Sequence, residues 1–257
     1  MTGVDPTSTL IPQPTLLEHT SGSCELLLIR HGRSADVVPG SDEASDPGLH
    51  PDGEAQVAAL ADRLRTKPID AVYASHLKRA VDTGAALATP RGLAVEQDPD
   101  LQEVLLGEWG QGEFRRRAAV RDPEWLEWSR TRRWDGIPGG EGDDALRRRV
   151  VAAVERLTER HRGQTIAVVA HGGVINAYLA DVLGLPVSLW LTVENTSITV
   201  VRVDELGHHV VVANDCHHLY DPVLGPPSAS APDTTSVQAA RLPPGPAAGT
   251  VPPGTSQ

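Results

Sequence analysis

Two histidines stand at matching places in the sequence, each directly after a short apolar segment and directly before glycine. Arg-His-Gly at 30–32 follows the apolar residues 25–30, and His-Gly-Gly at 171–173 follows residues 164–170. An imidazole can act as a nucleophile or carry a proton, and a neighbouring glycine lets a ligand approach the backbone closely. A lone histidine of this kind is more often structural than catalytic, but two of them after equivalent segments indicate a catalytic pair.

An arginine and a glutamate in two further motifs are also candidates for the chemistry. Arg79 lies in Ser-His-Leu-Lys-Arg-Ala at 75–80, in the first turn of an expected helix, and Glu103 precedes Gly-Glu-Trp-Gly at 107–110. Taken singly, the first is also explained as a solvated arginine and the second as an ordinary loop acid. Beside a cationic pocket, however, a carboxyl group can serve as a general acid.

Alternating strands and helices would have to position these groups. Short apolar runs favour buried strands, and apolar residues at helical spacing favour amphipathic helices. Such an order predicts an α/β sheet covered on both faces, whose ligands bind beyond the carboxyl ends of the strands. We expect strands at 25–30, 69–75, 93–96, 164–170, 197–203 and 209–213, and helices at 51–65, 78–88, 143–161 and 173–183.

Composition excludes several classes of protein. The chain has 257 residues with 23 Lys+Arg against 34 Asp+Glu, and a net charge of −11 argues against a nucleic-acid binder. No apolar run reaches the ~18 residues of a membrane span, and no signal peptide is visible. Cys24 and Cys216 cannot make a disulfide framework, and no spacing suggests a metal site. We therefore expect a cytoplasmic protein without a bound metal.

The order of these motifs strongly resembles the histidine phosphatase superfamily, also called the phosphoglycerate-mutase-like family. The resemblance spans roughly residues 25–220, and its specificity comes from four separated motifs that coincide. Weaker matches are Gly-Leu-His-Pro-Asp-Gly-Glu-Ala-Gln at 48–56, Pro-Gly-Gly-Glu at 138–141 and Asn-Asp-Cys-His-His-Leu at 214–219.

The resemblance implies a three-layer α/β/α sandwich with a mostly parallel central sheet, and a phosphatase that needs no metal or cofactor. His31 would attack phosphorus and become a phosphohistidine. Arg30 and Arg79 would bind the phosphate oxygens, and His171 would be a further donor to the phosphoryl group. Glu103 would protonate the leaving alkoxide and then take a proton from water.

Two neighbouring residues keep two interpretations each. Ser34 lies two positions after the glycine of Arg-His-Gly, where family members often bind phosphate, but it is equally explained as a turn or cap residue. Gly172 would either offer a backbone N–H to the phosphoryl group or serve only close packing.

The acid motif favours hydrolysis over transfer to a second hydroxyl. Residues 101–110 lack the Asn, Arg and Tyr of the mutase pattern, and the segment between Trp109 and Gly140 is shorter than the mutase insertion would be. We therefore predict hydrolysis of small phosphorylated metabolites. The alternatives are a phosphoglycerate-mutase-like phosphotransferase and a catalytically weak regulatory protein that binds partners through its tail, although the intact set of site residues speaks against the latter.

Several surface assignments follow from composition. Residues 112–137, with arginines between 115 and 133, would be a lid over the site, but we expect most of these arginines to form a solvated face. Arg-Arg-Arg at 147–149 is expected at the surface, and an exposed Trp190 would belong to an interface or to the core.

The ends of the chain differ in composition from its middle. We expect a flexible leader at 1–23, one catalytic domain at 24–221 and a disordered tail rich in Pro, Ala, Ser and Thr at 222–257. The oligomeric state and the identity of the phosphate ester stay open.

Overall fold

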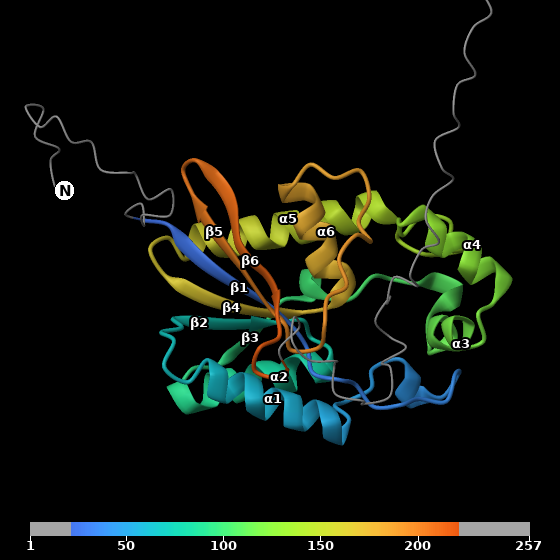
Figure 1. Ribbon diagram of the computed structural model, residues 1–257, viewed down its shortest axis with the longest axis horizontal. Helices are drawn as coiled ribbons and strands as arrows, with labels where there is room; N and C mark the ends of the chain where they lie inside the picture. Colours follow the sequence, from blue (N-terminus) through green and yellow to red (C-terminus); the bar gives the residue numbers. More distant parts are fainter. Residues whose placement is uncertain (1–21, 221–257) are drawn as a thin grey trace, which may run out of the picture.

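Six strands form one sheet in a computed structural model that describes residues 22–220 (Figure 1). The expected leader, apart from residues 22 and 23, and the expected tail lie outside the described residues. The sheet order is β3 (Val95–Gln97), β2 (Ala71–Ala74), β4 (Thr165–Ala170), β1 (Cys24–Arg30), β5 (Ile198–Asp204) and β6 (Gly207–Asp215).

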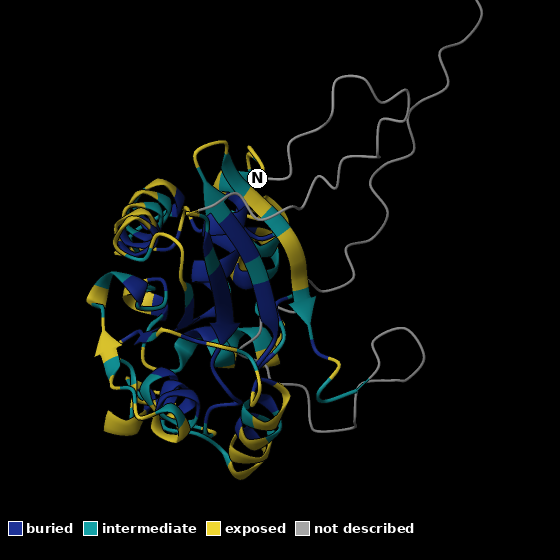
Figure 2. Cartoon of the chain, turned by 90° about the vertical axis from the view of Figure 1, so that its left-hand side faces the viewer, coloured by how far each residue is buried: buried dark blue, intermediate teal, exposed yellow. Residues whose placement is uncertain are grey.

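The sheet is mostly parallel, as expected. β3, β2, β4 and β1 pair in parallel, whereas β5 runs antiparallel to β1 and forms a hairpin with β6. Parallel strands in the middle of a sheet are covered on both faces, so they need continuous apolar sequence rather than alternation. In β1, every residue from Leu26 to Arg30 is buried, and Figure 2 shows the buried sheet at the centre of the described chain.

Helices cover both faces of the sheet. α1 (Pro51–Arg63) and α2 (Lys78–Ala88) lie on one side, and α5 (Asp143–Arg160) and α6 (Gly172–Val182) lie on the other (Figure 1). Alternate residues of β1 divide between the two apolar clusters: Leu27 and Ile29 pack with the first pair of helices, Leu26 and Leu28 with the second. The expected three-layer α/β/α sandwich is confirmed.

Two shorter helices stand beside these layers. α3 (Glu113–Ala119) and α4 (Pro123–Thr131) follow the 3₁₀ turns η1 (Asp42–Ala44), η2 (Thr89–Arg91), η3 (Pro99–Leu101) and η4 (Gly107–Trp109). These two helices, η4 and the segment after α4 carry a cluster of buried aromatic rings, whose neighbouring centroids lie 5.3–6.4 Å apart. The rings belong to Trp109, Phe114, Trp125, Trp128 and Trp134. Trp190, expected to be exposed, is half-buried and packs against the core on the α5 and α6 side.

The parallel register brings three strand ends to one edge. Arg30 of β1 lies beside Ala170 of β4, and Ala74 of β2 lies beside Val169. The residues that follow these strands, among them His31 and His171, therefore emerge side by side at the carboxyl edge, where ligands bind in open α/β sheets.

Candidate active site

His31 is buried directly after β1, and hydrogen bonds hold its own backbone and that of Gly32. Its N–H donates to the carbonyl of Ala170 at 3.0 Å, its carbonyl accepts from the Asn195 side chain at 2.9 Å, and the N–H of Gly32 donates to Thr83 Oγ1 at 3.1 Å. Asn195 and Thr83 were not among the site residues predicted from the sequence, since only tertiary packing brings them to the histidine.

The ring of His31 has one nitrogen occupied as a donor and one available as an acceptor. Nδ1 lies 2.7 Å from the carbonyl oxygen of Gly32, so Nδ1 carries the proton in the neutral ring. Nε2 then keeps its lone pair, and it accepts from Arg79 Nε at 3.2 Å. An imidazole in this tautomer presents Nε2 as a nucleophile.

Arg79 connects the two histidines. Its Nη2 lies 3.3 Å from His171 Nδ1, and the two imidazole centroids are 4.9 Å apart. From its place in the first turn of α2, the guanidinium therefore reaches the two histidines at the carboxyl edge of the sheet. Burial lowers its pKa to about 10, which leaves the guanidinium charged at neutral pH.

His171 is fully buried and does not itself line the cavity described below. Because Arg79 donates toward Nδ1, the proton of the neutral His171 ring belongs on Nε2. That atom is buried and has no hydrogen-bond partner within residues 22–220. Buried polar groups are seldom left unpaired, which makes this N–H a candidate hydrogen-bond donor.

Both histidines are held neutral. Burial, followed by the charge of Arg79, lowers the pKa of His31 and of His171 well below the ordinary value of 6.5. Arg30, which lies 3% exposed with Nη1 donating to the carbonyl of Val193 at 2.6 Å, adds to the same effect. The site therefore combines positively charged side chains with two uncharged imidazoles.

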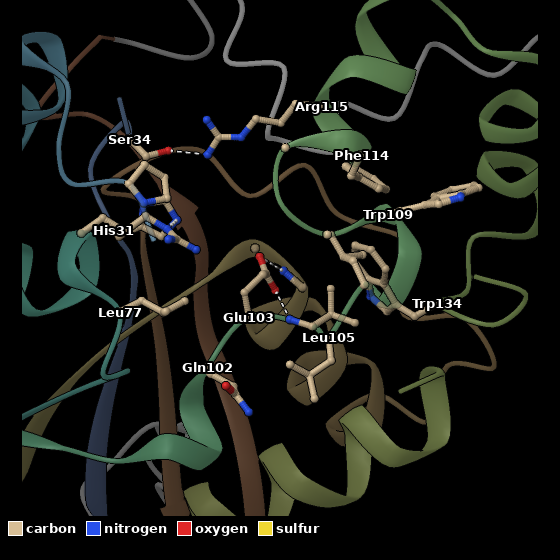
Figure 3. A pocket seen from close by; sticks show the side chains of 18 of the residues that line it. His31, Ser34, Leu77, Gln102, Glu103, Leu105, Trp109, Phe114, Arg115 and Trp134 are labelled. Carbon is tan, nitrogen blue, oxygen red and sulfur yellow. Dashed lines mark hydrogen bonds between the residues drawn. The ribbon is translucent and has the colours of Figure 1, made fainter. Parts of the chain in front are cut away.

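Glu103 lies on the loop after η3 and faces the cavity that His31 also lines (Figure 3). Its Oε1 accepts from the N–H of Val104 at 2.9 Å, and its Oε2 accepts from the N–H of Gly173 at 3.4 Å. A Cβ at Gly173 would come within 2.5 Å of Oε1, so glycine is required for the carboxylate to approach the start of α6.

Ser34 and Arg115 form a contact that the sequence did not reveal. Arg115 Nη2 donates to Ser34 Oγ at 3.0 Å, and its Nη1 donates to the carbonyl of Ala35 at 3.0 Å (Figure 3). Other arginines of the 112–137 segment pair with nearby acids, as Arg117 does with Glu113 at 2.8 Å. Arg115 thus brings a third guanidinium to the site, and no sequence signal separates it from its neighbours.

These groups line one cavity of about 360 Å³. Arg30, His31, Ser34, Arg79, Glu103 and Gly172 all contribute to its wall. The remaining wall is mostly apolar, with Leu77, Val104, Leu105, Leu106, Trp109, Phe114, Trp134, Leu189, Leu191 and Val193. The arrangement suits a small molecule with one anionic group and an organic remainder.

One expectation about surface arginines was wrong. Of the three at 147–149, only Arg148 is exposed, whereas the side chains of Arg147 and Arg149 are 17% and 14% exposed. Arg147 pairs with the fully buried Asp143, and Arg149 pairs with Glu141. A charge run on a helix usually faces solvent, but these two side chains turn inward because acids near the start of α5 and carbonyl groups on other segments accept from them.

The two histidines are expected to show opposite tautomers, Nδ1–H in His31 and Nε2–H in His171. Both should take up their proton at a lower pH than in the unfolded chain, because burial and the charge of Arg79 lower their pKa values. Long-range ¹H–¹⁵N spectra of the histidine rings measure both properties. The urea-unfolded chain supplies the reference titration, and matching titrations in the two states would contradict the expectation.

The chain is similar to several known proteins. The family model for the histidine phosphatase superfamily (branch 1) matches residues 26–216. Over 202 residues the chain is 33% identical to a metal-independent phosphoserine phosphatase of Arabidopsis thaliana, with 76% of this chain and 83% of that protein covered. It is 32% identical to the adenosylcobalamin/alpha-ribazole phosphatase of Escherichia coli over 64% of this chain and 82% of that one. The solved structure of a mycobacterial glucosyl-3-phosphoglycerate phosphatase superposes with a TM-score of 0.64 at 27% identity, covering 75% and 99% of the two chains.

Proposed function

Since this chain belongs to the histidine phosphatase superfamily (branch 1), we propose that it hydrolyses small phosphate monoesters through a phosphohistidine on His31, without a metal ion. One observation carries the proposal: a neutral imidazole whose Nε2 lone pair meets a buried arginine inside a cavity. Its surroundings can bind a phosphate dianion while the nucleophile itself stays uncharged.

In the first step, the lone pair of His31 Nε2 forms a bond to phosphorus as the bond from phosphorus to the ester oxygen breaks. The electron pair of that bond stays on the leaving oxygen, which takes a proton from the Glu103 carboxyl group. Glu103 is suited to this role because it lines the cavity and is held against the start of α6.

In the second step, a water oxygen attacks phosphorus and the bond from phosphorus to Nε2 breaks, returning the electron pair to the ring. Glu103, now a carboxylate, takes a proton from that water, and inorganic phosphate leaves. Both steps use the same carboxyl group in opposite directions.

Positive side chains would replace the hydration of the phosphoryl group. Arg30 directly precedes His31 in the chain, and Arg79 donates to His31 Nε2 at 3.2 Å. Arg115 adds charge through its place beside Ser34. Arginine is suited to phosphate because its planar donors match two oxygens at once. Three guanidinium groups and the N–H of His171 supply, in this proposal, the electrostatic role that a metal ion has elsewhere.

Gly172 keeps its proposed role as a backbone donor to the phosphoryl group. It is the first residue of α6 and lines the cavity, and a Cβ there would lie 3.8 Å from Arg30 Nε. Since that distance is ordinary van der Waals contact, packing alone does not demand glycine. The positive end of α6 would add to anion binding.

A panel of phosphate esters tests the function. The protein is incubated without added metal with benzyl phosphate, 4-nitrophenyl phosphate, phosphoserine, a nucleotide and 3-phosphoglycerate, and inorganic phosphate is measured. Release without a bisphosphate primer is the expected result and excludes the mutase alternative. No release from any ester, or equal release by a His31→Ala variant, would overturn the proposal.

Glu103→Gln is expected to act differently on good and poor leaving groups. For benzyl phosphate, whose alkoxide needs a proton, kcat/KM should fall by about 10²–10⁴-fold. For 4-nitrophenyl phosphate, kcat/KM should change little because nitrophenolate departs unprotonated. The two esters are of similar size, so a loss that is equal for both would contradict the acid role.

A further inference from the structure

We propose that Arg149 and Glu141 are positioning residues for Glu103, an inference that rests on the proposed acid role of that residue. The two side chains form an ion pair that holds the backbone on both sides of Glu103. Neither enters the proposed chemistry, and neither lines the cavity wall. Glu141 belongs to the Pro-Gly-Gly-Glu segment, which the proposed function leaves without a role.

Arg149 holds the backbone before the acid. From α5 its Nη1 donates to the carbonyl of Asp100 at 2.7 Å and to the carbonyl of Gln102 at 2.9 Å. The second of these carbonyls belongs to the residue that directly precedes Glu103. One guanidinium nitrogen therefore ties down the end of η3 and the start of the acid's loop.

Glu141 holds the backbone after the acid. Its Oε1 accepts from the N–H of Leu105 at 2.8 Å, and its own N–H donates to the carbonyl of Leu105 at 3.0 Å. Leu105 follows Glu103 by two residues. The loop is thus fixed on its second side by a reciprocal pair of hydrogen bonds.

The same two residues join these anchors to each other. Arg149 Nε lies 3.1 Å from Glu141 Oε2, and Arg149 Nη2 lies 2.5 Å from Oε1. The side chains are only 14% and 11% exposed, so the pair is little screened by solvent. Two parallel donors on one carboxylate also give a defined geometry, which a single lysine-like charge would not.

The turn that carries Glu141 is itself docked against the chain near the site. The N–H of Glu108 donates to the carbonyl of Pro138 at 2.9 Å. Gly107 has φ +50°, and a Cβ on it would come within 2.2 Å of the carbonyl carbon of Gly139. Glycine is needed at 107 for this contact, and the contact fixes the position of the turn that carries Glu141.

Glu103 needs such support because its own side-chain contacts constrain it little. Oε1 accepts from the next residue of the same loop, and the bond from Gly173 to Oε2 is 3.4 Å long. Neither contact fixes the backbone of the loop, because the first lies within the loop and the second is long. Proton transfer depends on placement to within about 1 Å, and a misplacement of that size can cost about 10²-fold in rate.

Arg149→Met tests the inference, with Glu141→Gln as the second variant. Methionine keeps the apolar stem of Arg149 and removes its donors, and glutamine keeps an acceptor for Leu105 while removing the charge. For Arg149→Met, kcat/KM on benzyl phosphate should fall by about 10²-fold, and kcat/KM on 4-nitrophenyl phosphate by no more than about threefold. Glu141→Gln should also lower both kcat/KM values, but by smaller factors than Arg149→Met. A variant that fails to fold leaves the other to decide.

Two arginines of the same helix serve as matched controls. Arg148 is the exposed neighbour of Arg149, and Arg156 pairs with the side chains of Asp98 and Asp100 without touching the Gln102 carbonyl. Arg148→Met and Arg156→Met should leave the ratio of the two kcat/KM values unchanged. A similar shift of that ratio in either control would overturn the specific role of Arg149.

A double variant separates positioning from general stabilisation. In the Glu103→Gln background there is no acid left to position, so adding Arg149→Met should cause no further loss on benzyl phosphate. A full additional loss, or an equal loss on both esters in the single variant, would overturn the inference. If Glu103→Gln itself shows no leaving-group dependence, the acid role in the proposed function fails first, and the two failures are thereby distinguished.

Discussion

His31→Ala is expected to lower kcat/KM by about 10⁴-fold or more for every ester that the protein hydrolyses, since removal of a nucleophile leaves only binding and electrostatic effects. Alanine takes away the Nε2 lone pair but leaves Arg30, Arg79 and Glu103 in the site. Binding should therefore survive, and inorganic phosphate should still inhibit or protect the variant. Initial rates with 4-nitrophenyl phosphate measure the loss, and thermal shift with added phosphate measures the binding.

His76→Ala is the matched control for that experiment. His76 is an exposed histidine near the start of α2 and does not line the cavity. Its replacement should leave kcat/KM unchanged. A His31→Ala protein that retains a tenth of the activity, or a control that loses as much, would be incompatible with the proposed nucleophile.

The phosphohistidine gives a direct measurement as well. Quenching the reaction in alkali, in which a phosphohistidine survives better than in acid, should leave a phosphorylated peptide that contains His31. Glu103→Gln should increase its yield with 4-nitrophenyl phosphate, because the second step loses its base while the first step needs no acid. A phosphorylated peptide from any other part of the chain would contradict the assignment.

Arg79→Ala is expected to cause the second large loss, about 10³-fold in kcat/KM. The guanidinium contacts both His31 and His171, and in the proposed mechanism it also binds the phosphoryl group. Arg79→Lys keeps the charge but not the planar set of donors, so it should recover only part of the loss. Arg148→Ala is the control, because that side chain is exposed.

Arg79→Ala should also shift the pKa values of both histidines. The charge of Arg79 contributes to the lowered pKa of His31 and of His171, so its removal makes protonation easier and raises both pKa values. Burial remains, and it is the larger cause, so the values should rise without reaching the ordinary range. Ring ¹H–¹⁵N spectra of Arg79→Ala across pH measure this shift, and an unchanged titration would contradict the role of its charge.

Much of the fold was predictable because its elements are specified locally. The continuous apolar sequence of β1 predicted a strand that is buried on both faces, and α2 begins and ends at the predicted residues, Lys78 and Ala88. Where strands and helices alternate, the carboxyl ends of parallel strands meet at one edge. For that reason Arg30, His31, Arg79 and His171, each close to a strand end, could be grouped before their distances were known.

Loop residues were predictable only through the family resemblance. Glu103 follows a 3₁₀ turn and not a sheet strand, so no rule of sheet topology brings it to the edge. The Pro-Gly-Gly-Glu segment was noticeable in the same way, but the partner of its glutamate was not. A motif carries the identity of a residue, whereas its contacts depend on which distant segment packs against it.

The sequence by itself therefore determined the sheet, its site edge and the four groups that lie at strand ends or in the helix turn that follows, because neighbouring residues specify those elements. Only the tertiary structure decided which arginines turn inward. Arg115 reaches Ser34 across 81 positions of the chain, and Arg149 reaches the Gln102 carbonyl across 47. An arginine pairs with whatever acid or carbonyl packing brings near it, and for Arg115 and Arg149 those acceptors lie on segments that are far apart in sequence.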